Sequence, residues 1–223
     1  MLILTTWRTP ATAYPDRILG RARIKTTRYR GYYECYGLRG HRYFHARNIR
    51  VKRLLIGNKG WMVDDPPHWW AMEEHAAVYH GHVLCAGLGL GLIVHALHAN
   101  PAVDRITVVE REQDVIDLVA PLVPQEKLHV VHGDFWNYRG RRPDGVLFDL
   151  FVGDGRQLLP DAIVAYSQMV QWFPKATIRI HGYNNKMFEP IQEAILAAKE
   201  TFNANRRSGA NRRRLLRDHR CGA

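Results

Sequence analysis

Apolar runs of four to seven residues recur through the middle of the chain, separated by segments whose apolar positions have a helical spacing. The runs are VLCA (83–86), ITVVE (106–110), LHVVHG (128–133), GVLFDLF (145–151) and TIRIHG (177–182). The helical segments lie at 90–99, 112–120, 161–173 and 186–203. Strand-like runs that alternate with helical crossovers predict an α/β fold with a mostly parallel sheet and flanking helices.

The first 63 residues have a different pattern. Residues 17–63 interleave β-forming with charged residues, which predicts short strands and turns, including a turn at 57–60. Two aspartates and two prolines at 64–67 then predict the start of a helix that ends at Gly81. We therefore divide the chain into a small β-rich N-terminal module (1–63), an α/β domain (64–203) and a C-terminal tail (204–223).

Charge separates these three parts more clearly than the net charge of +11 indicates. Residues 1–60 contain fourteen Lys and Arg against two acidic residues, and residues 204–223 contain seven Arg against one Asp. The segment 61–203 contains eleven basic and eighteen acidic residues. Two basic ends on an acidic body predict a polyanionic partner, and we expect nucleic acid.

Several protein classes do not fit the composition. The longest apolar runs are far shorter than the roughly 20 residues that span a bilayer, and the first residues lack the pattern of a signal peptide. The three cysteines, Cys35, Cys85 and Cys221, are far apart and contain no CxxC. This predicts a protein of the reducing cytoplasm with neither a membrane span nor a disulfide framework.

Three glycines at every second position follow the first predicted strand of the α/β domain. Gly87, Gly89 and Gly91 form a GxGxG pattern and not the GxGxxG of a dinucleotide fingerprint, because Leu92 stands where that fingerprint has its third glycine. No GK[ST] follows, so a phosphate-cradling loop is not predicted. Glycine in such a turn permits positive φ and lets a ligand approach the main chain. A tight turn without a ligand is the alternative.

Acidic residues stand at the ends of the next three predicted strands: Glu110, Asp134 and Asp149, with Asp154 following. Because the carboxyl ends of parallel strands share one edge of the sheet, these residues and the glycine turn are predicted to line a common cleft. An acidic cleft suits an adenosine that bears a positive group and disfavours a polyphosphate.

The segment 83–150 resembles the core of class I S-adenosylmethionine-dependent methyltransferases, which are Rossmann-like, and among them the spermidine-synthase-like branch. VLCAGLGLG is similar to the first motif of the family, VVEREQDVIDL to the second and HGDFW to the third. The resemblance implies S-adenosylmethionine as cofactor, with Glu110 on the ribose and Asp134 near the adenine amino group. It thus implies the cofactor-binding set Gly87, Leu88, Gly89, Gly91, Glu110, Asp134 and Phe135.

The resemblance also implies that the reacting group lies near Asp149, which is the predicted catalytic base if the acceptor loses a proton. Leu88, Phe135 and Phe151 would keep the site dry. The tight Asp-x-x-Asp of spermidine synthases is absent, because Asp149 and Asp154 are five apart. The closing hairpin of the usual seven-stranded sheet is expected to be short or missing.

Three functions stay open on this basis: methyl transfer with a nucleic-acid acceptor, aminopropyl transfer to a polyamine, and nucleic-acid binding without catalysis. Arg and aromatic residues alternate over 28–47, as in single-strand binders, although an amphipathic sheet with buried tyrosines has the same pattern. The twelve histidines show no metal-ligand spacing, and no metal site is predicted.

Overall fold

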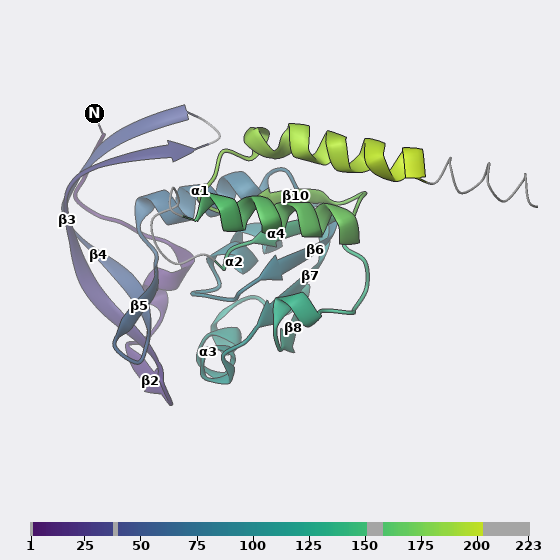
Figure 1. Ribbon diagram of the computed structural model, residues 1–223. Helices are drawn as coiled ribbons and strands as arrows, with labels where there is room; N and C mark the ends of the chain where they lie inside the picture. Colours follow the sequence, from purple (N-terminus) through teal and green to yellow (C-terminus); the bar gives the residue numbers. More distant parts are fainter. Residues whose placement is uncertain (1, 38–39, 151–157, 203–223) are drawn as a thin grey trace, which may run out of the picture.

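The computed structural model describes residues 2–37, 40–150 and 158–202, without the side chains of residues 34–42, and contains two β-sheets (Figure 1). The sheet of the α/β domain has five parallel strands in the order β10-β9-β6-β7-β8. They are β6 (Gly81–Ala86), β7 (Val103–Glu110), β8 (Leu128–His132), β9 (Gly145–Phe148) and β10 (Thr177–Ile180). The five predicted runs correspond to these strands, so the predicted fold class is confirmed.

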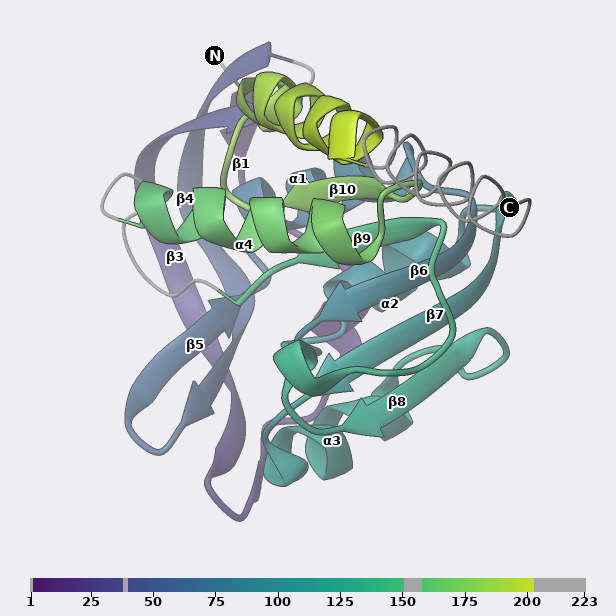
Figure 2. The same ribbon diagram turned by 45° about the vertical axis from the view of Figure 1, so that its right-hand side comes forward.

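Helices cover both faces of this sheet (Figure 2). One face packs on α1 (Pro66–Ala76), α2 (Leu92–His98) and α3 (Gln113–Val119), and the other on α4 (Leu159–Trp172) and a helix at 189–202. Short 3₁₀ turns are η1 (Pro10–Ala13), η2 (Ala120–Leu122), η3 (Phe135–Asn137) and η4 (Asn185–Phe188). Alternate β6 side chains point to the two cores, with Val83 and Cys85 in one and Leu84 and Ala86 in the other.

Helix α1 is shorter than predicted: it ends at Ala76, whereas the predicted helix continues to residue 80. The chain turns at Ala77 so that Tyr79 can enter the core, where its side chain is buried. The Tyr79 hydroxyl donates a hydrogen bond of 2.8 Å to the carbonyl oxygen of Val146 in β9. Packing and this bond therefore outweigh continued helix formation.

The N-terminal sheet is mixed and has the order β1-β4-β3-β2, with β5 also paired to β4. Its strands are β1 (Leu2–Leu4), β2 (Arg17–Leu19), β3 (Ala22–Gly37), β4 (Gly40–Ile56) and β5 (Lys59–Val63). Where short strands were predicted, β3 and β4 have 16 and 17 residues. The parallel strand β1 lies before residue 17 and was not predicted.

The two sheets share a core. Ile24 of β3 and Leu54 of β4 belong to the same apolar cluster as α1, α2 and α3. Earlier in β4, Phe44, Ile49 and Val51 form a separate cluster against α1 and the N-terminal segment. The N-terminal sheet therefore packs directly on the α/β domain beside the glycine turn. No helix in the described ranges is both long and apolar enough to cross a membrane.

Candidate functional site

A cavity of about 280 Å³ opens at the carboxyl ends of β6, β7 and β9. In this sheet β6 is the strand at which the order reverses, since the chain proceeds from it to β7 and β8 and later returns to β9. Ligands of open α/β sheets bind at this position. Seven of the eight predicted site residues line the cavity: Gly87, Leu88, Gly89, Glu110, Asp134, Phe135 and Asp149.

The glycine turn has a backbone that other residues rarely adopt. The φ angles of Gly87, Gly89 and Gly91 are 90°, 53° and 70°, a region in which a side chain would clash with the main chain. Gly91, the eighth predicted residue, is the N-cap of α2 and is not among the described residues that line the cavity. A Cβ on Gly91 would clash with Val123, so its glycine is required by packing.

Glu110 ties the end of β7 to the glycine turn. Its carboxylate accepts a 2.8 Å hydrogen bond from the Leu88 N–H and a 2.9 Å bond from the Glu112 N–H. The residue is only 6% exposed. A carboxylate can accept about four hydrogen bonds, so Glu110 keeps acceptor capacity toward the cavity while it fixes the turn.

Asp134 and the aromatic residues after it form the opposite wall, at the end of β8. Asp134 caps η3, with its Oδ1 accepting from the Trp136 N–H at 3.0 Å. Phe135 is buried and packs edge-on against Trp136 and Phe148 at centroid distances of 5.5 Å. Asp134 is itself exposed, which leaves its other oxygen available to a ligand.

Asp149 lines the cavity directly after β9, beside His68 and His181. It is half-buried and forms no hydrogen bond or ion pair with a described residue. His68 comes from the first turn of α1, and its Nδ1 lies 2.6 Å from Oδ1 of Asp65. Because an ionised carboxylate only accepts, Nδ1–H donates to Asp65 and leaves Nε2 as the ring nitrogen available to a substrate.

The Asp65 carboxylate and the protonated ring of His68 stabilise each other's charge. Burial alone would raise the pKa of Asp65, but the hydrogen bond and charge of His68 outweigh it and hold that pKa below its ordinary value. Burial likewise opposes protonation of His68, whereas the bond and the charge of Asp65 raise the pKa of His68 above its usual range. The Tyr29 hydroxyl of β3 also interacts with Asp65, which connects the N-terminal sheet to the pair.

His181 and His75 continue the row of imidazoles behind His68, with ring centroids 5.7 Å and 5.6 Å apart. Burial lowers the pKa of both, that of His75 to about 3, so these two rings are neutral at pH 7. In the described part of the chain, no group of three or more His, Cys, Asp or Glu is arranged to hold a metal ion.

The sequence did not predict the Asp65–His68 pair. The aspartates at 64–65 predict only a helix start, and the structure shows that Asp65 is the N-cap, since its Oδ1 accepts from the His68 N–H at 3.2 Å. The signal that would have found the pair is the histidine three residues after that capping aspartate. Asp154 and Phe151, which were predicted to line the cleft, lie outside the described residues.

No protein-family model matches the chain. No curated protein matches it either. Among solved structures, a dimethyladenosine transferase from Plasmodium falciparum is similar over 45% of this chain and 37% of its own, with 18% identity and a TM-score of 0.34. The plantazolicin methyltransferase BpumL, in complex with SAH, is similar over 51% of this chain and 45% of its own, with 16% identity and a TM-score of 0.37. This chain thus spans less than half of either structure.

Proposed function

We propose that the protein binds S-adenosylmethionine in the cavity at the end of β6 and transfers the methyl group to an acceptor, with nucleic acid as the acceptor class. The observation that carries this proposal is the position of Glu110. A buried carboxylate at the end of β7 bonds to the glycine turn after β6 and still faces a cavity. Carboxylates so placed suit the two hydroxyls of a ribose.

The chemistry of the lining residues fits this cofactor better than a nucleotide with phosphates. Arg111 is the one Lys or Arg among the described residues that line the cavity, whereas Glu110, Glu112, Asp134 and Asp149 are acidic. Acidic side chains repel a pyrophosphate and attract a sulfonium. The spermidine-synthase-like branch, which the sequence resembles, uses a related cofactor, so aminopropyl transfer is the alternative that an assay must separate.

When bound, S-adenosylmethionine supplies an electrophilic methyl group next to a positively charged sulfur. Glu110 and Asp134 would hold its ribose and adenine, as the motif resemblance implies. Phe135, Trp136 and Ile93 provide apolar wall that excludes water. Because the displacement is in-line, the main contribution of the protein is to hold donor and acceptor aligned.

We assign the proton-accepting role to His68 and an orienting role to Asp149, although Asp149 was the base that the sequence predicted. The neutral imidazole is the form that accepts a proton, so His68 can act as the base only above its raised pKa. Asp65 fixes the tautomer of His68 through the 2.6 Å contact to Nδ1. Asp149 faces the same cavity and can accept a hydrogen bond from the acceptor group.

The test is the transfer of a tritiated methyl group from S-adenosylmethionine to RNA, single-stranded DNA and protein. We expect incorporation into nucleic acid. Replacing His68 by Gln should lower kcat by roughly 10²–10⁴-fold, the contribution of a general base, while KM for the cofactor changes little. Asp149→Asn should raise KM for the acceptor more than it lowers kcat.

Decarboxylated S-adenosylmethionine with spermidine is the parallel arm of this assay. Aminopropyl transfer in that arm, or cofactor binding without methylation of any acceptor class, would contradict the proposal. A larger loss of kcat in Asp149→Asn than in His68→Gln would return the base to Asp149.

A further inference from the structure

Strand β3 presents an exposed row of cationic and aromatic side chains that no core covers. Arg28, Arg30 and Tyr32 are exposed, whereas the intervening Tyr29 and Tyr33 are partly buried. All three are accessible at the surface of the N-terminal sheet, on a stretch where the pairing of β3 with β4 shifts register between Tyr29 and Gly31. We call this stretch the Arg28–Tyr32 face.

An unfavourable charge pair lies on this face. Arg28 is directly opposite Arg50 in the antiparallel pairing of β3 and β4. Both are exposed, and neither forms a hydrogen bond or ion pair with a described residue. Like charges in directly opposite positions destabilise a sheet. An anion between them removes this repulsion, and a planar guanidinium matches the geometry of a phosphate.

A hollow of about 480 Å³ lies beside this pair, between β3–β4 and the N-terminal segment. Arg8 joins Arg28 and Arg50 in its lining, together with the exposed hydroxyls of Thr5 and Thr6. Asp and Glu are absent from its described lining residues. The hollow therefore offers guanidinium and hydroxyl donors to an anion.

Tyr32 adds an accessible aromatic surface. Its side chain is 72% exposed, and its ring stacks on the ring of His45 across the strand pair at a centroid distance of 4.2 Å and an angle of 9°. Tyr33, which belongs to the alternating stretch 28–47, instead packs inward on Tyr29 and Phe44. The structure therefore has the inward-facing tyrosines of an amphipathic sheet at Tyr29 and Tyr33, while Tyr32 is exposed.

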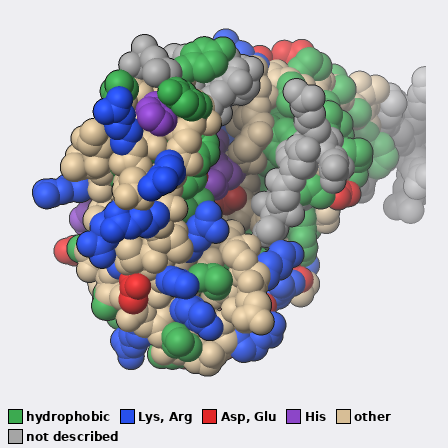
Figure 3. Space-filling view, turned by 90° about the vertical axis from the view of Figure 1, so that its left-hand side faces the viewer, with side chains coloured by type: hydrophobic (Ala, Val, Ile, Leu, Met, Phe, Trp, Pro, Cys, Tyr) green, Lys and Arg blue, Asp and Glu red, His purple; other side chains and the backbone are tan. Residues whose placement is uncertain are grey.

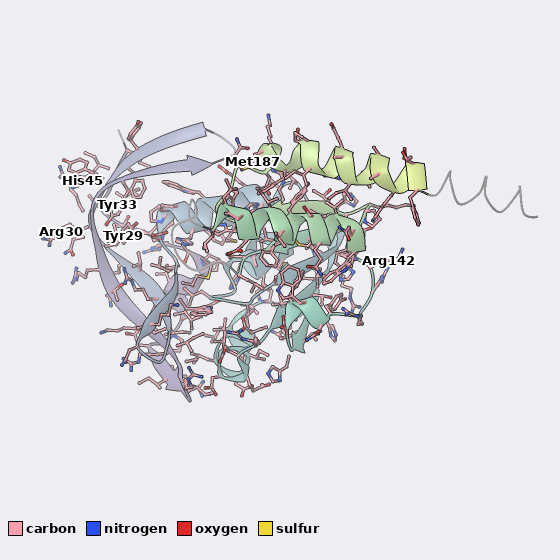
Figure 4. All side chains as sticks on the ribbon, in the orientation of Figure 1. Tyr29, Arg30, Tyr33, His45, Arg142 and Met187 are labelled. Carbon is pink, nitrogen blue, oxygen red and sulfur yellow. The ribbon has the colours of Figure 1, made fainter. Side chains whose placement is uncertain are left out.

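The surface views agree with this arrangement. Figure 3 shows Lys and Arg side chains gathered over the N-terminal sheet. Figure 4 shows Arg30 and His45 pointing away from the α/β domain, while Arg142 lies on the far side of the molecule. Arg30 and His45 thus lie on the side of the N-terminal sheet that faces away from the α/β domain.

We infer that the Arg28–Tyr32 face binds a single-stranded nucleic acid, with phosphates on Arg28 and Arg50 and an unpaired base on Tyr32. Alternating cations and aromatic rings are the composition of single-strand binding surfaces, because every unpaired base has a face that can stack. That the bound strand is also the methyl acceptor rests on the proposed function, whereas the binding itself does not.

Fluorescence anisotropy with a labelled single-stranded RNA, titrated with the full chain at several salt concentrations, tests the binding. We expect the double variant Arg28→Gln/Arg50→Gln to bind about tenfold more weakly or worse, and its logarithmic salt slope to fall by about 1.4, or 0.7 for each lost phosphate contact. Tyr32→Ala should weaken binding of the single strand about tenfold, and of the same sequence as duplex much less.

The matched control is Arg141→Gln/Arg142→Gln, which removes the same charge from exposed positions across the molecule. It should bind the strand within about threefold of the parent, because screened charges far from the site act weakly. Circular dichroism shows whether each variant is folded, and the C-terminal tail is the same in all of them. Heparin serves as the generic polyanion.

If both double variants lose the same affinity for the RNA, net charge explains the binding and the inference is overturned. Heparin binding that depends on Arg28 and Arg50 as strongly as the RNA binding does would overturn it as well. Absence of strand binding by the parent would also overturn it. Titration of the parent with S-adenosylhomocysteine separates this result from the proposed function. If the parent binds the single-stranded RNA but not S-adenosylhomocysteine, only the proposed function is contradicted. If it binds S-adenosylhomocysteine but not the RNA, only this inference is contradicted.

Discussion

Each glycine of the 87–91 turn has a different close neighbour. A Cβ on Gly87 would lie 3.2 Å from the carbonyl oxygen of Asp149. On Gly89 it would clash with the sulfur of Met62, which accepts the Leu90 N–H at 3.2 Å. Thus much of the space beside this turn is taken by the protein's own chain, and the glycines serve folding as well as any ligand.

Gly91 allows the folding role to be measured. Gly91→Ala places a Cβ at φ 70° and against Val123. We expect the free energy of unfolding to fall by about 2–4 kcal/mol, the sum of a left-handed backbone penalty and overpacking. Gly57→Ala is the control, since its φ of 59° is similar but nothing lies within 4 Å.

Gly57→Ala should lose only the backbone penalty, about 1 kcal/mol. Urea denaturation of the two variants gives the difference. Equal losses would show that contact with Val123 does not constrain Gly91.

At the scale of residues, the sequence predicted the site residues whose position follows from the end of a strand. It missed the residue whose position depends on a contact with another side chain. Glu110, Asp134 and Asp149 follow from the rule that parallel strands end at one edge, and all three line the cavity. The contact of His68 with Asp65 depends on a side-chain rotamer. The same carboxylate already had a sufficient explanation as a helix cap, so the pattern did not reveal its second partner.

At the scale of elements, the parallel strands were predictable because β6, β7 and β9 are buried on both faces and are continuous apolar runs. The long strands β3 and β4 were not. Their pairing shifts register near Tyr29 and Gly31, and Asn48 on β4 has a φ of 60°. The buried face therefore changes along β4, and a single alternation does not persist long enough to predict one strand.

Asp64 joins three of these elements. Its carboxylate accepts the Thr9 hydroxyl at 2.7 Å and the Lys52 N–H of β4. Its carbonyl oxygen accepts the indole N–H of Trp7 at 2.6 Å. Burial raises the pKa of Asp64 to about 6, against the lowering effect of the bonds from Thr9 and Lys52. The N-terminal segment is thus held to β4 and β5 by a fully buried acid.

This raised pKa predicts a pH dependence of stability. Between about pH 4 and pH 6 the folded state binds the Asp64 proton more tightly than the unfolded state, so the Asp64 contribution to stability is lost as pH rises. Asp64→Asn removes that dependence. Relative to the parent, its free energy of unfolding should rise by about 2 kcal/mol from pH 4 to pH 7.

Urea denaturation at both pH values measures this change, and other titrating groups cancel in the comparison. Asp104→Asn, at an exposed position of β7, is the control. A difference between Asp64→Asn and the parent that is the same at both pH values would contradict the assigned pKa.

For the whole molecule, the cationic sheet and the acidic cavity are adjacent. Trp61 and Met62 of β5 line the cavity, so the N-terminal sheet forms part of its wall. Tyr29 of β3 interacts with Asp65, which holds His68 at the cavity. A single-stranded nucleic acid on the Arg28–Tyr32 face would therefore bind to the same β-sheet that helps to position His68, the proposed general base.

Isothermal titration calorimetry with S-adenosylhomocysteine tests whether this cavity is a cofactor site. We expect the parent to bind it, and Glu110→Gln to bind about ten- to a hundredfold more weakly, since hydrogen bonds to a charged acceptor are worth about 1.5–3 kcal/mol. Asp104→Asn, near the other end of the same strand, should bind like the parent. Absence of binding by the parent, or an affinity of folded Glu110→Gln equal to that of the parent, would contradict the assignment of the cavity.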